Sequence, residues 1–279
     1  TFGQVFALAR LAASRYPEDA RDGIMAVIRA LFAAPFVVVL PLWSLAFAAG
    51  SPVTAIFPVG LILSAVMLLA VLRLWPSDKA VTWEDRPSGL TFRAALAEMG
   101  RPRIAARVLA LGAVTGASTL YMAIISLVMV AEVGRGTKDV ALYVGLVAGL
   151  EVPFMLALPR FTRGIGRPTL ILLGAALYAL HVALLPVLAG SPLVWGLIWP
   201  AAIGGALTLT VPIAYLQDLM ADRPGAGASL MAVQRLAGDV IAASCFALGT
   251  ALAGYGTVAV LGVAASLIGA AALWAADRR

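Results

Sequence analysis

Long apolar runs dominate the chain, and short polar segments separate them. A membrane-spanning helix needs about 20 mostly apolar residues, and eight runs meet this requirement. We predict spanning helices over 24–49, 52–75, 104–131, 139–158, 169–189, 193–219, 227–252 and 256–276. These runs are apolar on all sides, whereas the strands of a membrane barrel alternate apolar and polar residues. The pattern therefore predicts an all-α, polytopic membrane protein.

Composition supports this class and excludes others. Hydrophobic residues make up 62% and charged residues 12% of the 279 positions, against about 45–50% and about 25% in soluble domains. The formal net charge is +6, but the basic residues fall between the apolar runs, so we attribute them to membrane topology and expect no nucleic-acid partner. The one cysteine, Cys245, allows no intramolecular disulfide.

The basic residues also predict an orientation. Only Arg135 and Lys138 lie at one set of helix ends, while Arg29 and Arg235 lie inside predicted helices. The other 16 of the 20 lie at the opposite ends: Arg10, Arg15, Arg21, Arg73, Lys79, Arg86, Arg93, Arg101, Arg103, Arg107, Arg160, Arg163, Arg167, Arg223, Arg278 and Arg279. Because cytoplasmic loops carry excess Lys and Arg, we expect both termini of this chain to be cytoplasmic.

The longest polar segment, 77–103, separates two predicted helices from six and is expected to be a cytoplasmic loop between two helical units, 1–76 and 104–279. Within it, "LTFRAALAEM" has the composition of a short amphipathic helix at the membrane surface, although an unstructured tether would fit as well. On the other side, "GSP", "GRGTK" and "GYG" predict tight helical hairpins.

Glu151 is the strongest candidate functional residue, because it is a charge deep in an apolar run, "GLVAGLEVPFML". A charge at the centre of a spanning helix costs roughly 2.5–3.5 kcal/mol on insertion scales, so such residues face a cavity or a partner. Pro153 and the preceding Gly145 and Gly149 predict a local break and close helix approach. We expect Glu151 to bind substrate or exchange a proton; the alternative is a buried salt bridge that only holds helices together.

A second polar group approaches the cytoplasmic end of the sixth predicted helix, in "LTVPIAYLQDLM". Pro212 is a candidate conformational residue. Tyr215 and Gln217 could stack on a sugar and bond its hydroxyls, and Asp218 is a candidate gate or pathway residue. The alternative for Asp218 is a carboxylate that only reaches interfacial water.

A third group, Gln234, Arg235 and Asp239, lies inside the seventh predicted helix. Arg235 and Asp239 are four residues apart and share a helix face, so they can neutralise each other. Either this pair is structural, or it exchanges partners as the protein changes conformation; Arg235 is also a candidate counterpart of Glu151. Gln234 is a candidate for bonding substrate.

His181 and Arg29 have simpler explanations. His181 is the only histidine and is expected to be a satisfied core residue. Arg29 is a candidate conformational residue, and the alternative is that its long side chain only reaches the interface. We expect no metal site, because no cluster of ligands is visible. No nucleotide, dinucleotide or hydrolase motif is found, so we expect no cofactor and no enzymatic activity.

Several segments resemble the sugar efflux transporters of the major facilitator superfamily. The most specific are "GQVFALAR" at 3–10, "AGLEVPFML" at 148–156 and "YLQDLM" at 215–220, and the weaker ones are "IRALFAAPFVVVLP" at 28–41 and "QRLAG" at 234–238. The resemblance covers nearly the whole chain. It implies that Pro41 belongs to an antiport-type segment with a conformational role.

The resemblance also implies a domain organisation. Such transporters have two six-helix halves joined by a long cytoplasmic loop, and here the long loop follows the second predicted helix. The eight helices therefore resemble helices five to twelve, a partial major facilitator fold. On this basis 1–76 would end the N-terminal bundle and 104–279 would form the C-terminal bundle. The chain, which does not begin with Met, is expected to start part-way through a longer protein whose first helices are needed for transport.

We therefore expect a secondary transporter of the cytoplasmic membrane that exports a sugar or small glycoside, with protons as the coupling ion and alternating access to a site near the bilayer midplane. One alternative is a multidrug exporter of the same superfamily, which would have a larger and more aromatic cavity. Two others, from different classes, are an integral membrane enzyme acting on lipid or glycan and a non-transporting membrane domain.

Overall fold

The computed structural model describes residues 8–9, 12–13, 16–75, 97, 100–162, 164–219 and 224–277, and these residues are helical with short connections. The long helices are α2 (Glu18–Ala48), α3 (Ile56–Leu74), α5 (Pro102–Ser126), α6 (Thr137–Phe161), α7 (Arg167–Leu188), α8 (Ile198–Leu219), α9 (Pro224–Leu252) and α10 (Tyr255–Asp277). Short segments join them: η1 (Val53–Ala55), the π-helical η3 (Leu127–Glu132) and η4 (Pro192–Leu197).

The all-α, multi-pass membrane fold is confirmed. Within the described residues, seven helical segments are long and apolar enough to cross a membrane: Val53–Leu74, Pro102–Glu132, Thr137–Leu158, Arg167–Leu188, Pro192–Leu216, Ser229–Leu252 and Tyr255–Asp277. The remaining predicted span, 24–49, falls in α2, whose apolar part, Ala34–Ala48, is shorter. The segment "LTFRAALAEM", predicted as a surface helix, lies outside the described residues except for Ala97.

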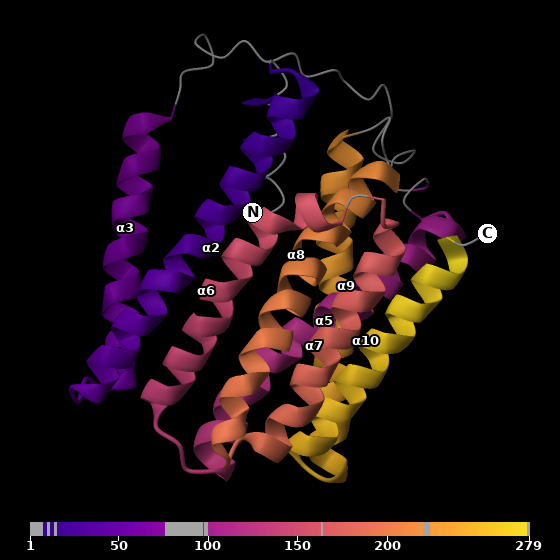
Figure 1. The fold of residues 1–279 in the computed structure, drawn as a ribbon. Helices are drawn as coiled ribbons and strands as arrows, with labels where there is room; N and C mark the ends of the chain where they lie inside the picture. The colour runs from indigo at the N-terminus through magenta and orange to yellow at the C-terminus, as the bar shows by residue number, and fades with distance from the viewer. Residues whose placement is uncertain are drawn as a thin grey trace.

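Helices α5 to α10 form one bundle in which consecutive helices run in opposite directions (Figure 1). We call the end that carries Arg103, Arg107 and Arg167 the basic end, and the end with the tight turns at Gly134, Gly190 and Gly254 the hairpin end. Gly134 and Gly254 have positive φ values of 74° and 93°, which glycine adopts without the steric cost that a side chain would add. The tight hairpins predicted from these turn residues are therefore present.

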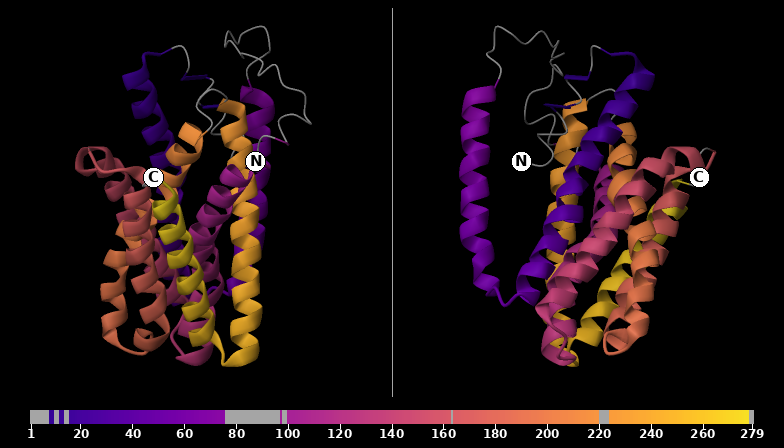
Figure 2. Two further views of the ribbon diagram at one scale, coloured as in Figure 1. Left: turned by 90° about the vertical axis from the view of Figure 1, so that its right-hand side faces the viewer. Right: turned by 60° about the vertical axis from the view of Figure 1, so that its left-hand side comes forward.

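Helix α2 packs along α6, whereas α3 stands at the side of the molecule (Figures 1 and 2). A Cβ added to Gly145 of α6 would lie 3.0 Å from Pro41 Cδ and 3.1 Å from Leu40 Cβ, so the absence of a side chain lets the two helices approach. The Ser44 hydroxyl donates to the Lys138 carbonyl at 2.8 Å across the same interface. Large apolar residues of α3 such as Leu61 and Leu72 are exposed, as expected for a helix surrounded by lipid.

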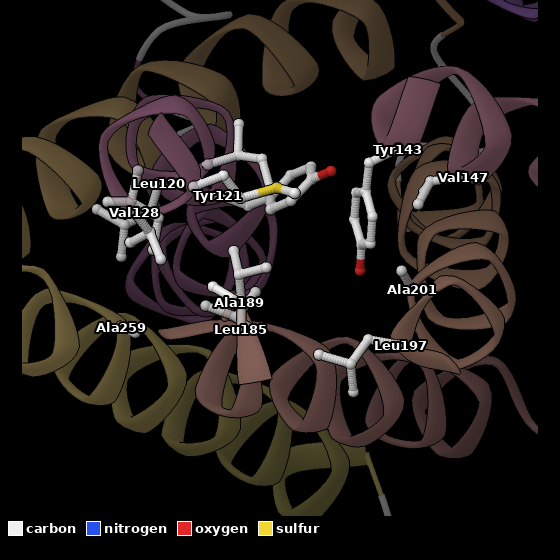
Figure 3. Packing of buried hydrophobic residues seen from close by; sticks show 14 of the residues in the cluster. Leu120, Tyr121, Val128, Tyr143, Val147, Leu185, Ala189, Leu197, Ala201 and Ala259 are labelled. Atoms are coloured by element: carbon white, nitrogen blue, oxygen red, sulfur yellow. The ribbon is translucent and has the colours of Figure 1, made fainter. Parts of the chain in front are cut away.

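The bundle core consists of two clusters of buried residues. The cluster toward the hairpin end includes Tyr121, Tyr143 and Val182, and Figure 3 shows Tyr121 and Tyr143 projecting from α5 and α6 into the bundle interior. The cluster toward the basic end includes Leu111 and Leu216. Small residues such as Gly204 and Gly238 let the helices pack closely beside these clusters.

Candidate functional site

Glu151 lies near mid-length of α6, where its carboxylate contacts α8. At 1.5 Å per residue it stands about 21 Å from the start of the helix. A Cβ added to Gly205 of α8 would overlap Glu151 Oε1 and lie 2.9 Å from Glu151 Cδ. The neighbouring Gly204 gives the same close approach to α7, since its added Cβ would lie 2.6 Å from the Tyr178 amide nitrogen. The two glycines therefore make room for the carboxylate between α6, α7 and α8.

No described residue forms a hydrogen bond or ion pair with Glu151. Tyr178 lies close by, because the consecutive residues Gly204 and Gly205 of α8 contact Tyr178 and Glu151, respectively. The alternative in which a salt bridge to Arg235 holds Glu151 finds no support, because Arg235 pairs elsewhere. A carboxylate at this depth without a compensating cation is expensive, which leaves it available to a proton or a polar ligand.

The predicted local break around Glu151 is wrong, because α6 is helical throughout Thr137–Phe161, including Pro153. The proline nevertheless removes a helical bond to the carbonyl four residues earlier, at Gly149. Gly149 has no side chain, and an added Cβ would meet only Val37 Cγ1 at 3.8 Å. The helix continues through Pro153 without that bond.

His181 is fully buried in α7 among three tyrosines. The Tyr143 hydroxyl lies 3.3 Å from His181 Nδ1, and the two rings stack with centroids 6.0 Å apart. Tyr121 and Tyr178 approach the imidazole edge-on, with centroids at 4.8 and 5.6 Å. The predicted burial of His181 is confirmed, but the prediction that its polar atoms are hydrogen-bonded is wrong for Nε2. His181 Nε2 and the Tyr121 hydroxyl are buried without a hydrogen-bond partner in the described part of the chain.

The third polar group lies at the contact of α9 with α5. The Gln234 amide donates to Thr115 Oγ1 at 2.8 Å and Gln234 is 8% exposed. Thr119 donates to Asp239 Oδ1 at 3.0 Å, and Arg235 Nε lies 3.9 Å from Asp239 Oδ2. The structure therefore brings Arg235 to Asp239, as one alternative predicted, and their side chains are 75% and 45% exposed.

The second polar group forms ion pairs at the basic end. Asp218 pairs with Arg167, which also donates to the Ala214 carbonyl at 2.6 Å. The Tyr215 hydroxyl donates to Asp277 Oδ2 at 2.6 Å, and Arg107 binds the other carboxylate oxygen of Asp277 through Nε and Nη2 at 2.9 and 2.5 Å. These contacts join α7 to α8, and α5 and α8 to α10.

The remaining predicted residues lie within continuous helices or outside the described side chains. Pro41 and Pro212 lie inside α2 and α8 without ending either helix. Arg29 belongs to α2 and Gln217 to α8, but their side chains lie outside the description. No group of three or more potential ligands among the described His, Cys, Asp and Glu residues could hold a metal ion.

A comparison with known proteins decides the family. The chain is 30% identical, over an alignment of 294 residues, to a protein of Deinococcus radiodurans named "Putative sugar efflux transporter", and the alignment covers 99% of this chain and 71% of the relative. This chain belongs to the sugar efflux transporter family. No family model and no solved structure matches the chain. The family resemblance inferred from "AGLEVPFML" and "YLQDLM" is thereby confirmed.

In this sugar efflux transporter family member, sequence reasoning missed the tyrosines around the site. Tyr121, Tyr143 and Tyr178 each lie within an apolar run, and tyrosine is a common core residue, so none carried a signal alone. Tyr143 and Glu151 are eight residues apart and therefore share a face of α6, which was a visible clue. Asp277 was missed because it adjoins the basic C-terminus and reads as a surface residue.

Proposed function

We propose that this transporter exports sugars or small glycosides across the cytoplasmic membrane in exchange for protons, by alternating access to a site near the bilayer midplane. The basic end, with both termini of the chain and the 77–103 loop, faces the cytoplasm in this proposal. The 16 to 2 distribution of basic residues supports that orientation. The printed name of the Deinococcus radiodurans relative supports a sugar as substrate.

One observation carries the proposal: Glu151 is an unpaired carboxylate at mid-depth, held against Gly205. A carboxylate can bind either a proton or the hydroxyl groups of a sugar, and a site that binds the two in alternation couples their movements. Arg235 and Asp239 are assigned to a pair that exchanges partners, and Tyr215 and Asp218 to the inner gate. Gln234 is left out of the substrate site, since its amide already binds Thr115.

Transport by the purified protein in proteoliposomes tests this function. A pH gradient that drives protons toward the cytoplasmic side should drive labelled lactose or a glucose analogue in the opposite direction. We expect Glu151→Gln to lower this transport about a hundredfold, in the range typical for loss of a proton-transferring group. Asp139→Asn is the control, because Asp139 lies in the first turn of α6 at the hairpin end, away from Glu151 and from the proposed gate at Asp218. This variant should transport at the wild-type rate.

Normal pH-driven transport by Glu151→Gln at normal expression would remove Glu151 from this role. Transport of cationic drugs without transport of any sugar would favour the multidrug alternative. Transport that is equally fast without a pH gradient in the wild type would contradict proton exchange.

A further inference from the structure

A column of polar side chains leads from the hairpin end of the bundle to Glu151. At 1.5 Å per residue, Tyr143 stands about 9 Å and Glu151 about 21 Å from the hairpin end of α6. Along α7, His181 stands about 10 Å and Tyr178 about 15 Å from Leu188 at that end. Tyr121 of α5 contacts the rings of both Tyr178 and His181. We call these four residues with Glu151 the polar column.

The polar column contains two groups that lack a partner. Tyr121 is 1% exposed and His181 is 0% exposed, yet the Tyr121 hydroxyl and His181 Nε2 have no hydrogen-bond partner among the described residues. An unsatisfied buried polar group costs about 1–3 kcal/mol, and native proteins usually satisfy such groups with a residue or an ordered water. Two such atoms in one column fit a bridging water molecule, which can both donate and accept a hydrogen bond.

The surroundings of His181 leave few other groups to exchange protons with it. Tyr121 approaches from α5, Tyr143 from α6 and Tyr178 from its own helix. The buried cluster around these tyrosines receives Ala201 from α8, and Val258 and Ala259 from α10. The titratable groups packed against this cluster are Cys245 of α9 and Tyr255 of α10, and both are only partly buried. Trp195 of η4 lies across Tyr143 with centroids 5.8 Å apart, on the side toward the hairpin end.

We propose that Tyr143, His181 and Tyr121 form a proton path between the hairpin end and Glu151. The inference rests on the proposed function, and it adds the route by which protons reach the carboxylate. In the proposed orientation the hairpin end faces away from the cytoplasm, which is the side from which a proton must enter an exporter. Trp195 packs across Tyr143, which is 0% exposed, so in this proposal the Trp195 ring moves aside when a proton enters from bulk water.

The path conserves protons at every step. A hydronium ion at the hairpin end gives a proton to the Tyr143 oxygen, while Tyr143 passes its own hydroxyl proton to His181 Nδ1. His181 then releases the proton on Nε2 to the Tyr121 oxygen through one bridging water, and Tyr121 passes its own hydroxyl proton to the Glu151 carboxylate through a second water, since no direct hydrogen bond joins the two side chains. Each bond broken to hydrogen is matched by one formed, so the net result is one water at the entrance and a neutral Glu151 carboxyl.

Tyr121→Phe is the sharpest variant, because it removes only the unpartnered hydroxyl and keeps the ring that packs against His181 and Tyr178. Two readouts are compared in proteoliposomes: pH-driven transport of labelled sugar, and sugar counterflow without a pH gradient, which needs no net proton movement. We expect pH-driven transport to fall at least about tenfold and counterflow to change less than about twofold. His181→Gln and Tyr143→Phe should show the same split.

Tyr255→Phe is the matched control, since Tyr255 is a partly buried tyrosine at the hairpin end that contacts Phe246 outside the column; both of its readouts should stay at the wild-type level. Unchanged pH-driven transport in Tyr121→Phe, or loss of counterflow together with pH-driven transport, would overturn the path while leaving the proposed function standing. A wild-type protein that moves sugar without any response to a pH gradient would overturn both.

Discussion

The polar column and the basic end both contain carboxylates and tyrosines, but the carboxylates at the basic end are paired, whereas the one in the polar column has no partner in the described part of the chain. At the basic end, Asp277 accepts hydrogen bonds from Arg107 and Tyr215, and Asp218 pairs with Arg167. In the polar column, Glu151 has no such partner among the described residues, and two further polar atoms are unsatisfied. The paired carboxylates fix helix ends to one another, whereas the unpaired one remains free to exchange a ligand.

Depth explains why the difference matters. The carboxylates of Asp277 and Asp218 lie at helix ends where their side chains are 18% and 64% exposed, so water and arginine share the cost of the charge. Glu151 lies at mid-depth, where an unpaired charge is expensive. Many proteins retain a residue that lowers their stability because it is needed for function. The comparison therefore predicts that changes in the polar column affect transport, whereas changes at the basic end affect stability.

After Glu151→Gln itself, the largest effect on transport is expected from Gly205→Ala, which changes the contact between α8 and Glu151. The added Cβ would overlap Glu151 Oε1, so the carboxylate must leave its place between α6 and α8. We expect pH-driven sugar transport to fall at least about tenfold, equivalent to about 1.4 kcal/mol in the energy of the transport step. The measurement is transport in proteoliposomes at matched protein content.

Two variants make the Gly205→Ala result specific. Gly60→Ala in α3 is the control, since an added Cβ there meets nothing within 4 Å and should leave transport unchanged. Combining Gly205→Ala with Glu151→Asp shortens the acid by one methylene and should restore part of the transport. If Gly205→Ala transports normally, Glu151 does not need the position that the structure gives it.

A smaller effect, on stability rather than transport, is expected from Asp277→Asn at the basic end. The change removes the charge that Arg107 and Tyr215 share and leaves the Arg107 guanidinium, 21% exposed, without its ion pair. We expect a loss of about 1–2 kcal/mol, between the values for exposed and buried pairs, which lowers the thermal midpoint by a few degrees. Asp218→Asn should cost less than about 1 kcal/mol, because Asp218 is far more exposed.

Thermal unfolding in detergent, followed for both variants under the same conditions, measures this difference. Equal midpoints for Asp277→Asn and Asp218→Asn would mean that the Arg107–Asp277–Tyr215 contacts add nothing to the stability of the bundle. The conclusion that the paired carboxylates of the basic end stabilise the bundle would then be wrong.

The sequence predicted the helices better than the polar contacts between them. Continuous apolar runs are enough to predict spanning helices, because in lipid a helix must satisfy its own backbone. Glu151 was predicted because one charge in such a run is costly. The unpaired state of Tyr121 and His181 could not be predicted, since it depends on how α5, α6 and α7 meet. The helical continuity through Pro153 was likewise not predicted, because a proline weakens a helix without always ending it.

The smallest expected effect is also the most direct test of the comparison: Glu151→Gln should leave the thermal midpoint unchanged or raise it slightly. Replacing an unpaired, partly buried carboxylate by a neutral amide of the same size removes a desolvation cost and breaks no ion pair that the described residues form. Asp277→Asn should lower the midpoint in the same assay. A clear drop for Glu151→Gln would show that the carboxylate stabilises the bundle through a partner, and the polar column would then be a structural network like the basic end.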